Sequence, residues 1–110
     1  MHNKIIEYKD FHKVSSSISG KKVVLTGGCF DIFHFGHFTF LKAAKKAGDI
    51  LVVLVESDEF IKKKKKKIPV HTQDQRAQIL AAFTMTDYVV KLPFFNSDAD
   101  YCTLVQRIKP

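Results

Sequence analysis

The stretch from Thr26 to His37, Thr-Gly-Gly-Cys-Phe-Asp-Ile-Phe-His-Phe-Gly-His, constrains the fold more than any other part of the chain. It follows residues 22–25, an apolar run with two valines that is typical of a buried parallel strand. Behind it, residues 38–47 place apolar side chains at helical spacing. A strand, a glycine turn and a helix start in this order predict the first half of a βαβ unit. The apolar face of the expected helix consists of Phe38, Leu41, Ala44 and Ala47.

The turn carries the residue types of a phosphate-handling site. Gly27 and Gly28 allow backbone N–H groups to approach a ligand that a Cβ would hold off. The helix start adds unpaired N–H donors and the positive end of a dipole, which favour phosphate. His34 and His37, three residues apart, can point to one side of the first helical turn. Two alternatives are structural histidines and a zinc site with Cys29, although zinc lacks a fourth ligand and the usual spacing.

The second strand completes the βαβ unit. Gly48 is expected to end the helix as its C′ residue, and residues 49–55 form the clearest strand in the sequence. A third short strand is expected at residues 88–90, ended by Pro93. This alternation predicts an α/β fold with a Rossmann-like parallel sheet flanked by helices. A last helix is expected to start within residues 96–100, with Leu104, Val105 and Ile108 on its apolar face.

Four polar residues follow the second strand at its carboxyl end. Ligands of open α/β sheets bind at the carboxyl ends of strands, so these side chains could border the site. A solvated turn that caps the next segment explains them equally well. The four residues are Glu56, Ser57, Asp58 and Glu59.

A run of six lysines, Lys62 to Lys67, follows this segment. Like charges in a row repel one another, so a stable helix is doubtful and a solvated loop is one interpretation. The other is that one or two of these lysines reach a phosphate group.

The next helix start is marked by a capping box, with Thr72 as N-cap and Gln75 three residues later. Arg76 lies in the first turn, where a cation opposes the helix dipole. Such a local misfit is expected at functional sites, and a surface arginine is the alternative. The apolar residues predicted to face the core are Ile79, Leu80 and Phe83.

Gly28-Cys29-Phe30-Asp31 followed by His34-Phe35-Gly36-His37 resembles the HxGH signature of the cytidylyltransferase-like nucleotidyltransferases. That family includes glycerol-3-phosphate cytidylyltransferase and the nucleotidyltransferase domain of heptose-phosphate biosynthesis. The resemblance continues through residues 49–60, 69–76 and 87–90. The order and spacing of these segments are specific for the superfamily and leave the substrate open.

The resemblance implies transfer of AMP or CMP from a nucleoside triphosphate to a small phosphorylated alcohol or sugar, with release of pyrophosphate. Mg²⁺ is expected to accompany the triphosphate, with no metal site built by the protein. A non-catalytic nucleotide- or RNA-binding module on the same fold is the alternative function. The catalytic candidates are His34, His37 and Lys64, with His37 closest to the reacting centre. The candidates for nucleotide binding are Gly28, Cys29, Phe30, Asp31, His34, His37, Lys66 and Arg76.

Two assignments within the turn have competing interpretations. Asp31 either contacts the substrate or caps the turn with its side chain. The phenylalanines at positions 33, 35, 38 and 40 are more typical of a core than of a platform for stacking a base.

A second arginine that the cytidylyltransferase branch carries eight residues after the position of Arg76 is replaced here by Thr84. This difference favours ATP over CTP.

With 110 residues, the chain is expected to form one domain. Residues 1–20 are predicted as an N-terminal helical or irregular segment, with a short amphipathic helix that breaks at three consecutive serines. This segment could pack on the domain or on the second subunit of a homodimer. Residues 21–110 correspond to the nucleotidyltransferase domain, which is incomplete relative to the family. A further strand, a glycine-acidic turn and a Ser/Thr-rich motif of the family do not occur in it.

The net charge and the cysteines indicate which binding partners and which cellular location to expect for this protein. The net charge of +7 indicates an anionic partner, and a polyphosphate accounts for it as well as nucleic acid does. The absence of RNP-type and CCHH motifs disfavours nucleic acid. No apolar run approaches the roughly 20 residues that span a bilayer, so no membrane partner is expected. Cys29 and Cys102 form no CxxC pair and are expected to be reduced thiols of a cytoplasmic protein.

Overall fold

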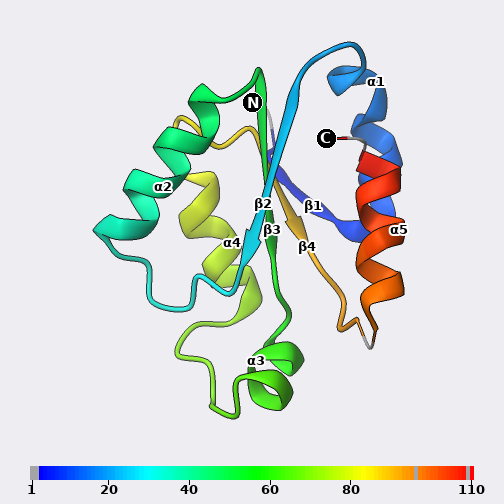
Figure 1. Ribbon diagram of the computed structural model, residues 1–110. Coiled ribbons are helices and arrows are strands. Elements are labelled where there is room, and N and C mark those ends of the chain that lie inside the picture. The colour runs from blue at the N-terminus through cyan, green and yellow to red at the C-terminus, as the bar shows by residue number, and fades with distance from the viewer. Residues whose placement is uncertain (1–2, 96, 109) are drawn as a thin grey trace.

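The structure is a computed structural model that describes residues 3–95, 97–108 and 110 (Figure 1). Within these residues, four parallel strands form one sheet in the order β1-β4-β3-β2. This confirms the predicted parallel α/β sheet. The strands are β1 (Ile5–Glu7), β2 (Val23–Gly28), β3 (Ile50–Val55) and β4 (Tyr88–Lys91).

The sheet is covered by helices on both faces (Figure 1). One face carries α2 (Phe35–Lys46) and α4 (Gln73–Ala81). The other carries the 3₁₀ helix η1 (Tyr8–Val14), α1 (Ser15–Ile18) and α5 (Asp98–Ile108). The short helix α3 (Asp58–Lys64) lies beyond the carboxyl end of β3. The described helices include none that is long and apolar enough to cross a membrane.

β3 is the central strand of the fold because both of its faces are buried. Val52 and Leu54 belong to the hydrophobic cluster beneath α5, whereas Val53 and Val55 belong to the cluster beneath α2 and α4. A strand covered on both faces is apolar throughout rather than alternating, which is why this run was the clearest strand signal.

The prediction of a short helix at the start of the N-terminal segment is wrong. Ile5–Glu7 is not helical but forms β1, which pairs in parallel with β4. A three-residue strand is too short to show a period of two, and its stability comes from pairing with β4. The serines at 15–17 belong to α1 instead of ending the helical pattern. Phe11 and Ile18 are buried in the cluster that α5 covers, so the segment packs on the domain.

Two further expectations about the helices change. Gly48 does not have the left-handed conformation of a C′ residue. It is required by close packing instead, because a Cβ there would lie 2.7 Å from Cγ2 of Val24. The lysine run is partly helical, since α3 extends to Lys64 and is anchored by the buried side chain of Ile61.

The capping box of α4 is confirmed, with the Oγ1 of Thr72 accepting from the N–H of Gln75 at 3.2 Å. The buried face differs from the prediction. Leu80 is buried, but Ala77 and Arg76 are buried with it, whereas Ile79 and Phe83 are only half-buried. In α5, Leu104 and Ile108 are buried as predicted, but Val105 is 44% exposed. Asn96, where the expected helix start began, lies outside the described residues.

Candidate active site

The turn that links β2 to α2, which we call the histidine turn (Cys29 to His37), lies at the carboxyl end of the sheet. β2 extends through both glycines, so Gly28 is the last residue of the strand rather than part of the turn. Phe30 follows in a left-handed conformation (φ 51°), and its ring is buried. A Cβ on Gly28 would lie 3.2 Å from that ring. Gly28 therefore makes room for the ring of Phe30, and its predicted contact with a nucleotide stays a prediction.

The two histidines fix one another at the start of α2. The Nδ1 of His34 accepts from the N–H of Gly36 at 3.0 Å, and the Nδ1 of His37 accepts from the N–H of His34 at 3.1 Å. Their rings stack with centroids 3.9 Å apart. Because each Nδ1 is an acceptor, the proton of each neutral ring must lie on Nε2. Among the described residues, neither Nε2–H has a hydrogen-bond partner, so both remain available as donors.

Gly36 is required by this arrangement. The imidazole of His34 folds back over the backbone N–H of residue 36, and a Cβ there would lie 2.7 Å from Cε1 of His34. The glycine of the HxGH pattern thus allows the first histidine to cap the helix.

The surroundings of His37 keep its ring neutral. Burial lowers the pKa of His37, and the neighbouring His34 lowers it further. Phe30 and Phe33 flank the ring, with centroids 5.4 and 5.2 Å away. At neutral pH, His37 is therefore a neutral hydrogen-bond donor through Nε2.

Asp31 connects the histidine turn to the loop before α4. Its carboxylate accepts from the N–H groups of Val70, at 2.9 and 3.0 Å, and of His71 at 3.0 Å. Burial raises the pKa of Asp31, but these two N–H groups together with the charges of Arg76 and Lys67 outweigh burial and hold the pKa below its usual value. Asp31 thus caps a loop 39 residues away in sequence and not, as the capping interpretation expected, its own turn.

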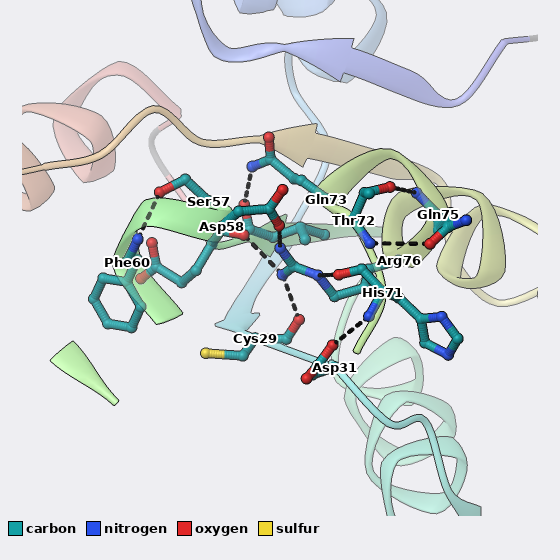
Figure 2. Close-up of polar contacts among 12 residues, drawn as sticks. Cys29, Asp31, Ser57, Asp58, Phe60, His71, Thr72, Gln73, Gln75 and Arg76 are labelled. Carbon is teal, nitrogen blue, oxygen red and sulfur yellow. Dashed lines mark hydrogen bonds and ion pairs between the residues drawn. The ribbon is translucent and has the colours of Figure 1, made fainter. Parts of the chain in front are cut away.

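Arg76 is the centre of the second cluster, which we call the arginine network (Figure 2). Its side chain has no exposed surface, so the surface-arginine interpretation is wrong. It donates to the carbonyl oxygens of Cys29 and Glu56, both at 2.8 Å. It also donates to His71 O at 3.2 Å and to the carboxylate of Asp58 at 2.5 Å. These four bonds tie together the ends of β2 and β3 and the starts of α3 and α4.

The four polar residues after β3 have separate functions. Ser57 caps α3 by accepting from the N–H of Phe60 at 3.1 Å, as the turn interpretation predicts. Glu59 is exposed and pairs with Lys63 on the same helix at 3.8 Å. Asp58 instead neutralises Arg76. Glu56 is buried and accepts from the hydroxyl of Tyr101 at 2.8 Å.

The pair of Glu56 and Tyr101 was missed in the sequence. The available signal was an acidic residue placed directly after a run of buried strand residues. Tyr101 lies 45 residues away on α5, and no local pattern connects the two.

The lysines whose charges act on the ionisable groups of the histidine turn differ from those selected from the sequence. Lys64 ends α3 and Lys66 has a left-handed backbone (φ 59°), and both are exposed. Burial raises the pKa of the Cys29 thiol, and the ammonium groups of Lys65 and Lys67 oppose that rise. Lys67 also acts on Asp31. The charges that reach the turn thus belong to Lys65 and Lys67.

The phenylalanines of the turn and of α2 do not form the core that the sequence favours. Phe35 is 78% and Phe40 is 53% exposed. Phe33 and Phe38 are half-buried, and both pack against Phe83, at centroid distances of 4.9 and 5.7 Å. The core interpretation is therefore wrong for Phe35 and Phe40.

The zinc alternative has no structural support. Across residues 3–95, 97–108 and 110, no group of three or more His, Cys, Asp or Glu side chains could hold a metal ion.

Fold and site together define an α/β domain with a Rossmann-like parallel sheet, whose free imidazole donors lie at a helix start. The sequence profile of the cytidylyltransferase-like family matches residues 25–110. The chain belongs to this family.

Individual relatives agree with this assignment. The chain is 44% identical over 108 residues to the "Bifunctional protein HldE" of Campylobacter fetus subsp. fetus, an alignment that covers 97% of this chain and 22% of the relative. It is 43% identical over 103 residues to the protein of the same name from Nitratiruptor sp., covering 93% of this chain and 20% of the relative. The chain thus spans about a fifth of the length of these relatives.

A solved structure shows the same fold. The lipopolysaccharide core biosynthesis protein from Thermoplasma volcanium superposes with a TM-score of 0.70 at 33% sequence identity. The match covers 83% of this chain and 70% of that protein.

Proposed function

We propose that this domain is a nucleotidyltransferase that transfers AMP from ATP to a small sugar phosphate. A phosphate oxygen of the acceptor attacks the α-phosphorus in line, the bond from that phosphorus to the bridging oxygen breaks, and pyrophosphate leaves. The observation that carries the proposal is the pair of unpartnered Nε2–H donors, held at the first turn of α2 by backbone hydrogen bonds.

In this mechanism the protein positions the two substrates and neutralises the charge on the phosphoryl oxygens, and it forms no covalent bond to either substrate. The Nε2–H groups of His34 and His37 would donate to phosphoryl oxygens on which negative charge develops. Because both rings are held by their Nδ1 atoms, the donors need little reorganisation during the reaction. His37, neutral because its pKa is lowered, would act as a hydrogen-bond donor rather than as a cation.

Lysine side chains would neutralise the leaving pyrophosphate. The sequence favoured Lys64 and Lys66, but the charges of Lys65 and Lys67 act on the turn itself. We therefore propose Lys65 and Lys67 for this role. Arg76 would contribute indirectly, by fixing the backbone at Cys29 and Glu56, because its guanidinium already makes four hydrogen bonds to the protein.

Mg²⁺ would enter with the triphosphate and neutralise charge on its oxygens. The nearby carboxylates do not fit a protein-held ion, because Asp31 is occupied by backbone N–H groups and Asp58 by Arg76.

The preference for ATP rests on Thr84, which stands where the cytidylyltransferase branch has a second arginine. A threonine cannot replace a planar, permanently charged phosphate clamp. Calorimetric titration of the chain with each nucleotide in the presence of Mg²⁺ tests the choice. We expect heat of binding with ATP, and binding of CTP with none of ATP would overturn it.

The acceptor class is supported by the resemblance to the heptose-phosphate branch and by the similarity to the Thermoplasma protein, a lipopolysaccharide core biosynthesis protein. The decisive experiment measures pyrophosphate release with ATP or CTP against sugar 1-phosphates and glycerol 3-phosphate. We expect release with ATP and a sugar phosphate. Binding of nucleotide without release for any pair would favour the non-catalytic module.

A further inference from the structure

Among the residues that the structure describes, Glu56 is the buried carboxylate at the carboxyl end of the sheet to which the proposed mechanism gives no role. It is 9% exposed, and its Oε2 accepts from the hydroxyl of Tyr101 at 2.8 Å. Its Oε1 is buried and has no hydrogen-bond partner among the described residues. A buried carboxylate oxygen without a hydrogen bond is unfavourable, so a donor is expected to reach it.

The position of Glu56 is fixed through its backbone and through its side chain. Its N–H donates to Gly28 O at 3.1 Å, and its carbonyl accepts from Arg76 at 2.8 Å. Tyr101, which also packs edge-on against Phe95 with centroids 4.9 Å apart, holds the second carboxylate oxygen. The carboxylate is therefore a fixed acceptor just below the surface.

Two cations act on the Glu56 carboxylate, Arg76 and Lys65. The hydroxyl of Tyr101 is already used, and Arg76 donates four of its five N–H groups to other oxygens, so Lys65 is the cation with free donors. Burial raises the pKa of Glu56, whereas the hydrogen bond from Tyr101 and the charges of Arg76 and Lys65 oppose this rise. Lys65 is exposed and closes α3, the helix that begins two residues after Glu56.

We propose that Glu56, held by Tyr101 of α5, positions the ammonium group of Lys65 beside the histidine turn so that it faces the triphosphate. An ammonium group has three N–H donors, so one bond to Oε1 leaves two for phosphate oxygens. Without this anchor, a lysine in a run of six exposed lysines has no preferred direction. Glu56 is thus a positioning residue that acts through Lys65, and this inference rests on the proposed nucleotide-binding function.

The test is a double-mutant cycle on the 110-residue chain, read as the affinity for ATP with Mg²⁺ by calorimetry. We expect Glu56→Gln and Lys65→Ala each to weaken binding by roughly tenfold, a coupling typical of residues in contact. In the Lys65→Ala background, Glu56→Gln should have no further effect. Lys62→Ala, which removes the same charge from the same run, is the matched control and should leave the affinity unchanged.

Tyr101→Phe provides a second variant that keeps the carboxylate. It should weaken ATP binding less than Glu56→Gln does, and it should also have no effect once Lys65 is alanine. A merely structural role would instead lower the melting temperature and weaken binding equally in both backgrounds, which would overturn the proposal. If the wild-type chain binds no nucleoside triphosphate, the proposed function fails, whereas wild-type affinity in folded Glu56→Gln refutes only the positioning.

Discussion

Two clusters of nitrogen donors lie at the carboxyl end of the sheet and differ in how many of their N–H groups are already used. In the histidine turn, Nδ1 of each ring accepts from the backbone and each Nε2–H is free. In the arginine network, Arg76 is fully buried and makes four hydrogen bonds to protein oxygens. Both clusters lie on sequence motifs of one family, but the first keeps both Nε2–H donors free, whereas the second has four of its five N–H groups bonded within the protein.

The comparison shows that a motif residue can act at a site in two different ways. The histidines are held by their acceptor atoms so that their donors point outward. Arg76 uses its donors to fix the ends of two strands and a neighbouring loop, which places the histidine turn. We therefore expect changes in the arginine network to affect folding first and changes in the histidine turn to affect chemistry first.

The largest effect is expected for Arg76→Met, which keeps the apolar stem and removes every donor. Three carbonyl oxygens and the carboxylate of Asp58 would lose a partner, so the free energy of unfolding should fall by about 3 kcal/mol or more. Urea denaturation measures this. Arg76→Lys, which keeps the charge but not the fork of donors, should be intermediate. Unchanged stability together with lost ATP affinity would contradict the structural role of Arg76 and would indicate that it contacts the nucleotide.

His37→Gln tests the other cluster. A glutamine at this helix position can still accept from the N–H of His34, but it does not reproduce the Nε2–H donor. Pyrophosphate release should fall by about two orders of magnitude, as for the loss of a preorganised donor to transition-state charge. The melting temperature should change little. A folded variant with wild-type turnover would remove His37 from the mechanism.

Gly36→Ala should disturb the same cluster by sterics alone. The new Cβ would lie 2.7 Å from Cε1 of His34, so the ring must rotate and lose its bond to the helix. Turnover is expected to fall by roughly tenfold, since small displacements of catalytic groups have large effects. Gly27→Ala is the matched control, because its Cβ would meet Leu54 at an ordinary 3.4 Å. Equal activity of the two variants would argue that the position of His34 is unimportant.

Alanine substitutions along the lysine run should separate functional from solvated lysines. Lys65→Ala and Lys67→Ala should raise the KM for ATP by roughly threefold to tenfold through the loss of a charge-assisted contact. Lys62→Ala should have no effect. Uniformly small increases across all six positions would support a solvated loop, and an effect confined to Lys64 and Lys66 would favour the choice made from the sequence.

The smallest effect is expected in the pH dependence of folding stability. Because burial and His34 lower the pKa of His37 in the folded state, the unfolded chain binds a proton there at a higher pH than the folded chain does. Stability should therefore decrease as the pH falls below about 6.5, the usual pKa of histidine. Thermal melts at pH 7.5 and 5.5 should show a larger loss for wild type than for His37→Gln. Equal losses would contradict a neutral His37.

The sequence predicted the order of the elements because each signal was local. β3 is buried on both faces and therefore apolar throughout, and Thr72 with Gln75 forms a capping box from residues three apart. The histidine turn was found for the same reason, since both of its helix-start interactions connect residues within three positions. Such features depend on backbone geometry that neighbouring residues determine.

The tertiary structure decided the features that depend on partners far away in the sequence. β1 is a strand only because β4 pairs with it, and Asp31 caps a loop 39 residues later. Arg76 looked like a functional misfit in its helix, yet it is neutralised by Asp58 and by carbonyls at the ends of two strands. Burial and long-range hydrogen bonds therefore determine which donors remain free, and the sequence alone could not distinguish the buried, hydrogen-bonded arginine from the available histidines.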